Sequence, residues 1–252
     1  MKPTEFLAAL ESGELRAASR DAEGTWHANP EVKEGILELF RRGKIQKLGV
    51  TPFAAFRDKD TLPTRHFDAA SKVRVVPGGT SVRRGAHLAQ GVVLMPPAYV
   101  NVGAYVGEGS MIDSHALVGS CAQVGARVHV GAASQIGGVL EPIGATPVVI
   151  EDDVFVGGNV GVYEGVLVRE RAVLAPGVIL SGGTRVFDLV NERELSSGSG
   201  LEIPAGAVVV PGARPATGAF AREAGLTVAC ALIVKIRDAN TDAATTLEDA
   251  LR

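Results

Sequence analysis

Three charged side chains in the middle of the chain are of the types that an acid–base reaction on an amine requires. Asp113 directly follows the aliphatic residue Ile112, and Glu164 comes two residues after Val162 at a predicted turn. A carboxylate beside a groove can hold an amine nucleophile or take its proton, whereas most carboxylates at turns are simply solvated. Arg74 has the planar guanidinium that binds a substrate carboxylate through two hydrogen bonds. Its alternative role is to cover apolar surface with its stem.

Three histidines, His87, His115 and His129, lie in the same part of the chain. A catalytic metal site in a repeat protein needs three histidines that converge on one ion. His115 and His129 are fourteen residues apart, which is not a multiple of the six-residue repeat described below, so we expect no metal site. Either residue is a candidate general base, and an ordinary surface role is the alternative for both.

The two cysteines, Cys121 and Cys230, do not make a disulfide scaffold. As a nucleophile, Cys121 would need a histidine base, which the sequence does not place. We expect Cys121 to pack at a corner of the fold.

A repeat of six residues indicates the elements that position these side chains. Aliphatic residues occur at every sixth position over 76–136 and again over 150–186, and a second series, four residues after each, is small or β-branched. Neither a helix nor a flat strand repeats every six residues, whereas a chain that turns a corner every six residues does. We therefore predict a parallel β-helix of about six coils, with three hexads to a coil. The aliphatic positions, or rungs, are Val76, Val82, Leu88, Leu94, Val100, Val106, Ile112, Val118, Val124, Val130 and Ile136, then Ile150, Val156, Val162, Val168, Leu174, Leu180 and Val186.

Glycine often follows a rung, as at Gly107, Gly131 and Gly157. Corners with strained backbone favour glycine because it lacks a Cβ. Chance alternation in a β-sandwich is the alternative, but it does not explain two series that stay in phase over so many turns.

Two segments interrupt the repeat. Fourteen residues separate Ile136 from Ile150, so either one hexad carries an eight-residue loop or two hexads carry one extra residue each. This segment includes Glu141, another carboxylate. The second excursion, over 191–200, is polar and rich in glycine. Such loops are often functional, and a tolerated surface loop is the alternative.

The repeat divides the chain into three parts. Residues 1–70 are predicted to form a small α-helical domain, with a helix over 4–15, a second helix that begins at Pro30, and a loop over 57–66. The β-helix spans 72–212. Residues 213–252 are predicted to form a strand over 226–236 and a short helix with Leu247 and Leu251 on one face. Both flanking parts are expected to cover the open ends of the β-helix.

Composition limits the possible partners. The net charge of −3 over 252 residues provides no general attraction to nucleic acid or to a membrane surface. No apolar run approaches the roughly 20 residues needed to span a bilayer, and the N-terminus lacks a signal-peptide pattern. We expect a cytoplasmic protein with reduced thiols.

The outward positions of the repeat are unusually small over 131–138, 157–161 and 175–183. Because a β-helix has no interior cavity, a ligand must bind to its outer faces. A groove lined by backbone groups suits an extended chain of amides, such as the pantetheine arm of coenzyme A. Small residues are also what tight turns require, which is the alternative interpretation.

The sequence resembles the tetrahydrodipicolinate N-succinyltransferases, a family of hexapeptide-repeat acyltransferases. The resemblance covers about residues 10–250, and its strings are much more specific than the repeat alone. They are LESGELRAA, RVVPGGTSVRRGAHLAQGVVLMPPAYVNVGAYVGEGSMID, VGSCAQVGARVHV, IGGVLEPIGATPVVIEDDVFVGG and CALIVKIRDA. The resemblance implies a homotrimer of left-handed β-helices with active sites between subunits.

The resemblance also implies the reaction. Members transfer succinyl from succinyl-CoA, a co-substrate and not a permanently bound cofactor, to the amine of ring-opened tetrahydrodipicolinate on the route to diaminopimelate and lysine. By motif, the substrate-binding arginine of the family falls on Arg74, and the acidic residue that binds substrate and acts as base falls on Asp113.

Two departures from the family pattern matter. Ser114 and His115 stand where Thr-Trp is common, and Gly161 stands where many members have a second catalytic acid. Glu164 aligns with another glutamate of the pattern, so Asp113 and Glu164 are the candidate catalytic acids. The departures keep open an acetyl-CoA-dependent enzyme or transfer to another amine, and a non-catalytic β-helical scaffold is a third interpretation.

The expected coenzyme A contacts are the small residues of the groove together with one lysine. A backbone N–H near Gly137 or Gly157 is expected to stabilise the tetrahedral oxyanion. Lys235 and Arg237 are candidates for contacts to the phosphates, although solvation of a strand edge is the favoured alternative. The predicted contact set is Gly137, Gly138, Gly157, Gly158, Ala175 and Lys235.

Overall fold

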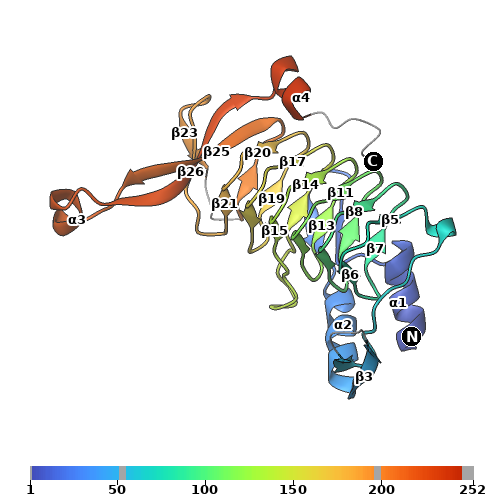
Figure 1. The fold of residues 1–252 in the computed structure, drawn as a ribbon. Helices are drawn as coiled ribbons and strands as arrows, with labels where there is room; N and C mark the ends of the chain where they lie inside the picture. The colour runs from blue at the N-terminus through green and yellow to red at the C-terminus, as the bar shows by residue number, and fades with distance from the viewer. Residues whose placement is uncertain (1, 51–54, 196–199, 246–252) are drawn as a thin grey trace.

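Three parallel sheets form the body of the protein in the computed structural model, which describes residues 2–50, 55–195 and 200–245. Each hexad contributes a two-residue strand, and successive strands pass from one sheet to the next (Figure 1). A strand therefore pairs with the strand three positions later, as Val106 does with Val124. The chain winds as a triangular parallel β-helix, which confirms the predicted architecture at the level of its coils.

The three faces differ in what lies against them, and we name them accordingly. The open face consists of β6 (Ser81–Val82), β9 (Tyr99–Val100), β12 (Leu117–Val118), β15 (Gln135–Ile136), β18 (Gly161–Val162) and β21 (Ile179–Leu180). The covered face, against which the N-terminal segment packs, consists of β7 (His87–Leu88), β10 (Tyr105–Val106), β13 (Gln123–Val124), β16 (Val149–Ile150), β19 (Leu167–Val168) and β24 (Glu202–Ile203). The long face begins with β5 (Arg74–Val75), β8 (Val93–Leu94), β11 (Met111–Ile112), β14 (His129–Val130), β17 (Phe155–Val156) and β20 (Val173–Leu174), and β25 (Ala207–Pro215), β26 (Thr227–Ile236), β22 (Val186–Asp188) and β23 (Arg193–Leu195) extend it.

The predicted rungs form the core. Every rung from Val82 to Val186 is at most 5 % exposed and belongs to one apolar cluster. Ser110 and Ser134, polar members of the second series, are also fully buried, and their hydroxyls donate to the carbonyls of Gly125 and Gly157. One large and one small side chain per hexad therefore fill the prism, as close packing of a narrow interior requires.

The first interruption belongs to one hexad. Ile150 pairs with Val124 on the covered face, directly after Ile136 on the open face. The eight extra residues therefore form a single loop at the corner between these faces, and the next coil resumes in register.

The repeat ends differently from the prediction. Val186 is buried, but its strand β22 pairs with β23 and β26 and does not continue the coil. The next rungs are Ile203, which pairs with Val168, and Val209, which pairs with Leu174. Strand β25 also runs through the predicted boundary at residue 212.

At the other end, Val76 is only half-buried and Val75 pairs with Leu94 in its place. The first coil has no strand below it, so its rung has only one neighbouring layer to pack against.

The N-terminal segment contains the two predicted helices, α1 (Pro3–Ser12) and α2 (Pro30–Arg42). It also contains two antiparallel hairpins that were not predicted: β1 (Ala18–Arg20) with β2 (Trp26–Ala28), and β3 (Ile45–Val50) with β4 (Ala55–Lys59). Strand β4 overlaps the predicted loop over 57–66, which is therefore partly wrong. A short 3₁₀ turn, η1 (Ala69–Ser71), precedes the first coil.

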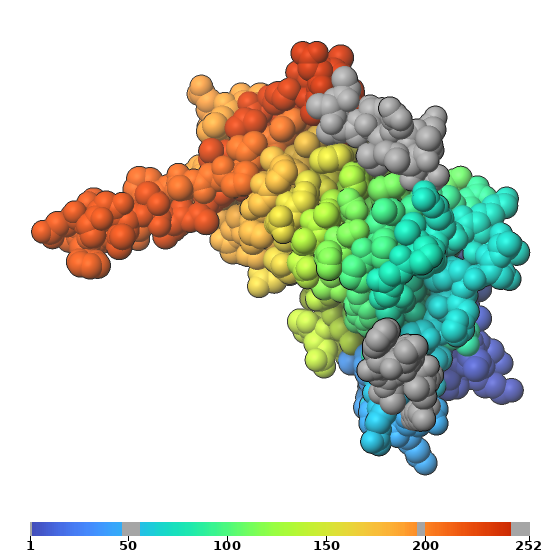
Figure 2. All heavy atoms as spheres, viewed as in Figure 1, coloured from blue at the N-terminus to red at the C-terminus, as the bar shows by residue number. Residues whose placement is uncertain are grey.

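A long hairpin of β25 and β26 extends the long face and projects from the body as an arm, with α3 (Ala219–Glu223) at its tip (Figures 1 and 2). The strand predicted over 226–236 is confirmed. Helix α4 (Ala239–Thr245) follows, and the predicted helical face of Leu247 and Leu251 lies outside the described residues.

Candidate functional site

Arg74 and Asp113 lie on the same side of the molecule. Arg74 is on β5 and Asp113 follows β11, with β8 between these two strands of the long face. Strands are spaced about 4.8 Å apart, so the two positions are about 10 Å apart along the stack. A guanidinium and a carboxylate therefore lie on one side of the prism, two strands apart.

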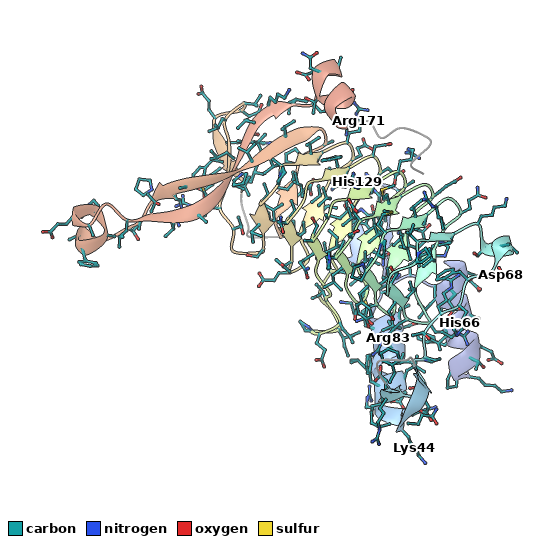
Figure 3. All side chains as sticks on the ribbon, viewed as in Figure 1. Lys44, His66, Asp68, Arg83, His129 and Arg171 are labelled. Carbon is teal, nitrogen blue, oxygen red and sulfur yellow. The ribbon has the colours of Figure 1, made fainter. Side chains whose placement is uncertain are left out.

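The Asp113 carboxylate is held at a corner and faces a histidine. Its Oδ1 accepts a 2.7 Å hydrogen bond from the backbone N–H of Ser114. Its Oδ2 lies 3.5 Å from Nε2 of His129, which is on β14 directly above β11. The His129 ring, labelled in Figure 3, also meets the edge of Phe155 at a centroid distance of 5.2 Å. One carboxylate oxygen is thus engaged by backbone, and the other is positioned beside a partly exposed imidazole.

The corner between the long and open faces has almost no side chains above Asp113. A Cβ at Gly131 would lie 2.6 Å from the carbonyl oxygen of Val156, and one at Gly157 would lie 2.7 Å from the nitrogen of Pro176. These backbones are too close for any side chain. The predicted contacts Gly157, Gly158 and Ala175 follow β17 and β20 at this same corner, which is therefore a smooth wall of backbone.

The predicted oxyanion donors need one correction. The N–H of Gly137 donates to Val162 and that of Gly157 donates to Leu174, both as part of the strand ladder. The N–H groups of the following residues, Gly138 and Gly158, donate no hydrogen bond to another described residue. They are the amides at these two corners that a ligand can use.

Glu164 lies elsewhere, at the corner between the open and covered faces. Its backbone has a positive φ of 54°, and its Oε2 accepts a 2.9 Å hydrogen bond from the N–H of Gly182 in the next coil. Gly137 and Gly138 are at this same corner. One chain therefore does not bring Glu164 together with Asp113.

A cavity of about 400 Å³ lies where the arm meets the open face. Arg185 and Arg214 contribute two guanidinium groups, and Gly177, Ser181 and Gly212 contribute small surfaces. The Nε of Arg214 is buried and has no hydrogen-bond partner among the described residues. The sequence did not point to either arginine, because the two are 29 positions apart and no spacing connects them.

Cys121 packs at a corner, as predicted. Its side chain is fully buried against the N-terminal helices, and burial raises the pKa of its thiol to about 12. A thiol that stays protonated is a poor nucleophile.

The remaining predicted contacts are bound within the chain. Lys235 forms an ion pair with Asp238 at 3.1 Å, and Arg237 donates to the carbonyl oxygen of Asp153. His87 stacks on Tyr105. His115 is exposed at a corner, where its backbone has a positive φ of 62°. The ion pair of Lys235 supports its structural alternative, and the roles of the histidines stay predictions.

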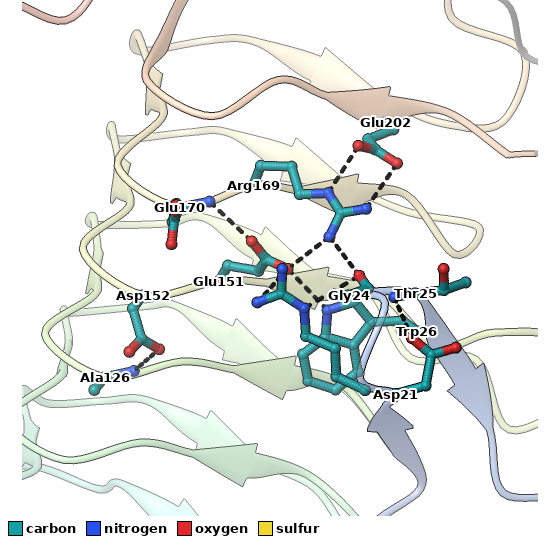
Figure 4. A network of polar contacts seen from close by, with 11 residues as sticks. Asp21, Gly24, Thr25, Trp26, Ala126, Glu151, Asp152, Arg169, Glu170 and Glu202 are labelled. Carbon is teal, nitrogen blue, oxygen red and sulfur yellow. Dashed lines mark hydrogen bonds and ion pairs between the residues drawn. The ribbon is translucent and has the colours of Figure 1, made fainter.

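A buried ionic network joins the covered face to the N-terminal hairpin (Figure 4). Glu151 is 5 % exposed and accepts hydrogen bonds from Trp26 Nε1 at 2.9 Å and Arg169 Nη1 at 3.0 Å. Arg169 also binds Glu202 and the carbonyl oxygen of Gly24. Arg20, 3.6 Å from Glu151, is the second cation beside the two carboxylates, so the charges balance and the geometry indicates cohesion between the two parts of the chain.

Within the residues that the structure describes, no three His, Cys, Asp or Glu side chains are grouped to hold a metal ion. In the same residues, no helix has the length and apolar character needed to cross a membrane.

Two family models match separate parts of the chain. Residues 4–41 match the tetrahydrodipicolinate N-succinyltransferase N-terminal model, and residues 147–181 match the hexapeptide repeat of succinyl-transferase. The first contains α1 and α2, and the second contains the coils above Asp113.

A solved structure from Campylobacter jejuni, described as a 2,3,4,5-tetrahydropyridine-2-carboxylate N-succinyltransferase, aligns with a TM-score of 0.55 at 16 % identity. The alignment covers 90 % of this chain and 61 % of that one, so this chain spans about three fifths of its length. At this identity the likeness supports the fold alone.

Full-length relatives are much more similar in sequence. A 2,3,4,5-tetrahydropyridine-2,6-dicarboxylate N-succinyltransferase of Azoarcus sp. (strain BH72) is 43 % identical, over 98 % of this chain and 88 % of its own length. The enzyme of the same name from Bordetella avium (strain 197N) is 44 % identical, over 97 % and 86 %. With this identity over nearly the whole of both chains, the protein belongs to the 2,3,4,5-tetrahydropyridine-2,6-dicarboxylate N-succinyltransferase family.

Proposed function

We propose that this protein transfers the succinyl group of succinyl-CoA to the amine of ring-opened tetrahydrodipicolinate, a step of diaminopimelate and lysine biosynthesis. The observation that carries the proposal is the full-length relationship to succinyltransferases at 43–44 % identity, in a chain that has Arg74 and Asp113 on one face. A cytoplasmic location is part of the proposal, and the two free, buried cysteines are in keeping with it.

The proposed mechanism is direct transfer without an acyl-enzyme. Arg74 binds a carboxylate of the acceptor, and Asp113 orients its amine. The amine nitrogen attacks the thioester carbonyl, and the amine proton passes to Oδ2 of Asp113. The tetrahedral oxyanion receives hydrogen bonds from a corner N–H such as that of Gly158. The C–S bond then breaks, and the coenzyme A thiolate leaves and takes up a proton.

Succinyl-CoA is proposed to lie along the corner between the long and open faces. Gly157, Gly158 and Ala175 provide the backbone wall for pantetheine, and Arg214 in the cavity is positioned for an anionic group of the co-substrate, whereas Arg185 is already paired with Glu194. The buried, unpartnered Nε of Arg214 supports this placement because an unpaired buried donor is costly unless a ligand satisfies it. Gly137, Gly138 and Lys235 are at other places and are weaker candidates.

The proposed assembly is a homotrimer of left-handed β-helices that meet through their open faces. No charged side chain points outward from the strands of that face. Asp113 follows the third strand of the long face, whereas Gly161 is in the fifth strand of the open face, which is about 10 Å higher along the stack. In this assembly the acceptor is proposed to lie between two copies, against Asp113 of one and the open face of the other. The outward residues are Ser81, Tyr99, Leu117, Gln135, Gly161 and Ile179.

Thiol release from succinyl-CoA and acetyl-CoA, each with tetrahydrodipicolinate, tests the proposal. We expect turnover with succinyl-CoA that falls at least about 100-fold in Asp113→Asn, the range typical of a lost proton acceptor. Glu164→Gln separates the two candidate acids, and we expect a smaller loss because Oε2 of Glu164 is bound to Gly182. Faster turnover with acetyl-CoA than with succinyl-CoA would indicate that the protein is an acetyltransferase. No turnover with either donor would contradict the proposal.

A further inference from the structure

The ring of Tyr163 occupies the space that a side chain at position 161 would fill. Tyr163 follows the rung Val162 at the corner between the open and covered faces. A Cβ added to Gly161 would lie 2.5 Å from the ring Cε2 and 2.8 Å from the phenol oxygen. A Cβ added to Gly137, directly beneath Tyr163, would lie 2.7 Å from Cδ1. The ring therefore lies back over the open face, in a place that two glycines leave empty.

The hydroxyl of Tyr163 is available to a ligand. It makes no hydrogen bond to another described residue, although the side chain is half-buried. Tyr99, on the same face, differs in that its hydroxyl donates to Oδ1 of Asn101 at 3.3 Å. The oxygen of this hydroxyl is not one of the buried, unpartnered polar atoms of the described residues, so it is open to solvent and can donate to a ligand on the open face.

The surroundings favour an anionic or carbonyl partner. Ile179 lies directly above Gly161 and borders the cavity that contains Arg214, whose buried Nε has no hydrogen-bond partner among the described residues, and Arg185, which is paired with Glu194. The strands of the open face carry no outward carboxylate that would compete for the hydroxyl. A phenol O–H donates a hydrogen bond to an oxygen of a carboxylate or carbonyl, whereas a carboxylate accepts the proton of an amine.

We infer that Tyr163 takes the place of a side chain at position 161 and donates a hydrogen bond to an oxygen of the acceptor substrate. This inference rests on the proposed function. Tyr163 is thus a substrate-binding residue, and Asp113 alone receives the amine proton. Gly161 and Gly137 are the positions that give the ring its room.

The first test is Tyr163→Phe, which removes the hydroxyl and keeps the ring. We expect kcat/KM for tetrahydrodipicolinate to fall about tenfold, in line with the loss of one hydrogen bond. The KM for succinyl-CoA and the thermal midpoint stay unchanged. Tyr105→Phe is the matched control, with kcat/KM within about twofold of wild type because Tyr105 is on the covered face, away from the proposed contact between copies. An unchanged kcat/KM for the acceptor in Tyr163→Phe would overturn the inference about Tyr163. Loss of activity in Asp113→Asn in the same assay would still support the proposed succinyl transfer.

The second test does not depend on catalysis. Gly161→Glu forces a side chain into the ring of Tyr163, so we expect a lower thermal midpoint than wild type. Combining it with Tyr163→Ala makes room for the glutamate, and the double variant is expected to melt higher than Gly161→Glu alone. If Tyr163→Ala gives Gly161→Glu no such gain, the ring does not occupy that space and the inference fails, whatever the enzyme assay shows.

Discussion

The covered face and the open face have the same interior and opposite exteriors. Both bury one aliphatic rung per strand, such as Val124 and Val118. The outward residues of the covered face contact the N-terminal segment: Nδ1 of His87 lies 2.9 Å from the carbonyl oxygen of Glu11, and Gln123 accepts a hydrogen bond from Arg16. The outward residues of the open face are uncharged and have no such cover.

The difference shows that the repeat determines the inside of the prism and leaves the outside free to vary. On the covered face, aromatic rings and buried charges bind the chain to its own N-terminus. Arg16 lies 3.7 Å above the ring of Tyr105, and burial lowers the pKa of its guanidinium. On the open face, uncharged residues leave a surface that a second copy can approach.

The largest expected effect is on the open face. Leu117→Lys places a charge in the centre of the proposed contact between copies, where it would be desolvated without a partner. We expect the assembly, about three times the 26.1 kDa chain, to dissociate and turnover to be lost. Light scattering after size exclusion measures the mass, and circular dichroism checks that the β-helix is intact. Glu34→Lys, on the exposed side of α2, is the control that keeps its mass. An active Leu117→Lys of unchanged mass would rule out this face as the contact.

The next effect is on the covered face. Glu151→Ala removes the buried partner of Arg169 and Trp26, and we expect the free energy of unfolding to fall by about 3 kcal/mol. Glu202 is the other carboxylate bound to Arg169, and its side chain is 50 % exposed. We expect Glu202→Ala to lower the free energy of unfolding by at most about 1 kcal/mol. Urea denaturation of both variants gives the comparison. Equal losses would mean that burial does not distinguish the two carboxylates.

The smallest effect is a pH dependence of the covered face. Burial lowers the pKa of His87, and the nearby Arg65 and Arg16 lower it further. Because the unfolded chain then binds the proton more readily, this contribution to stability is present above about pH 6.5 and is lost as the pH falls. We expect the thermal midpoint to drop between about pH 7.5 and 5.5, and to drop less in His87→Gln. A variant with the same pH slope as wild type would contradict the assignment.

The coils were predictable because the six-residue period is a direct consequence of packing one large side chain per strand into a triangular core. The prediction failed at both ends, at Val76 and Val186. A rung is buried by the coils on either side of it. At the two ends of the β-helix the neighbouring segments do not follow the six-residue period, so the period cannot predict their contacts. The strand β26 next to Val186, for example, is about 40 residues further along the chain.

The candidate site was predictable to a similar extent. Arg74 and Asp113 fall on one face because both hold defined places next to a rung. Counting hexads would have placed Glu164 and Asp113 at different corners of the β-helix. They were grouped as candidate acids because both match the family motif, and the corner that each occupies was not considered. The cavity at the base of the arm was not predictable, because Arg185 and Arg214 meet only when β26 pairs with both β22 and β25.

The amino-acid sequence by itself determined the coiled interior, the corner glycines and the family, since each depends on residue types at fixed spacing. Tertiary structure alone decided which strands close the coil, which face the N-terminal segment covers, and which hydroxyl fills the space over Gly161. These outcomes depend on contacts between residues that are distant along the chain. Local spacing carries no information about such contacts, because they form only when the whole prism and its arm are assembled.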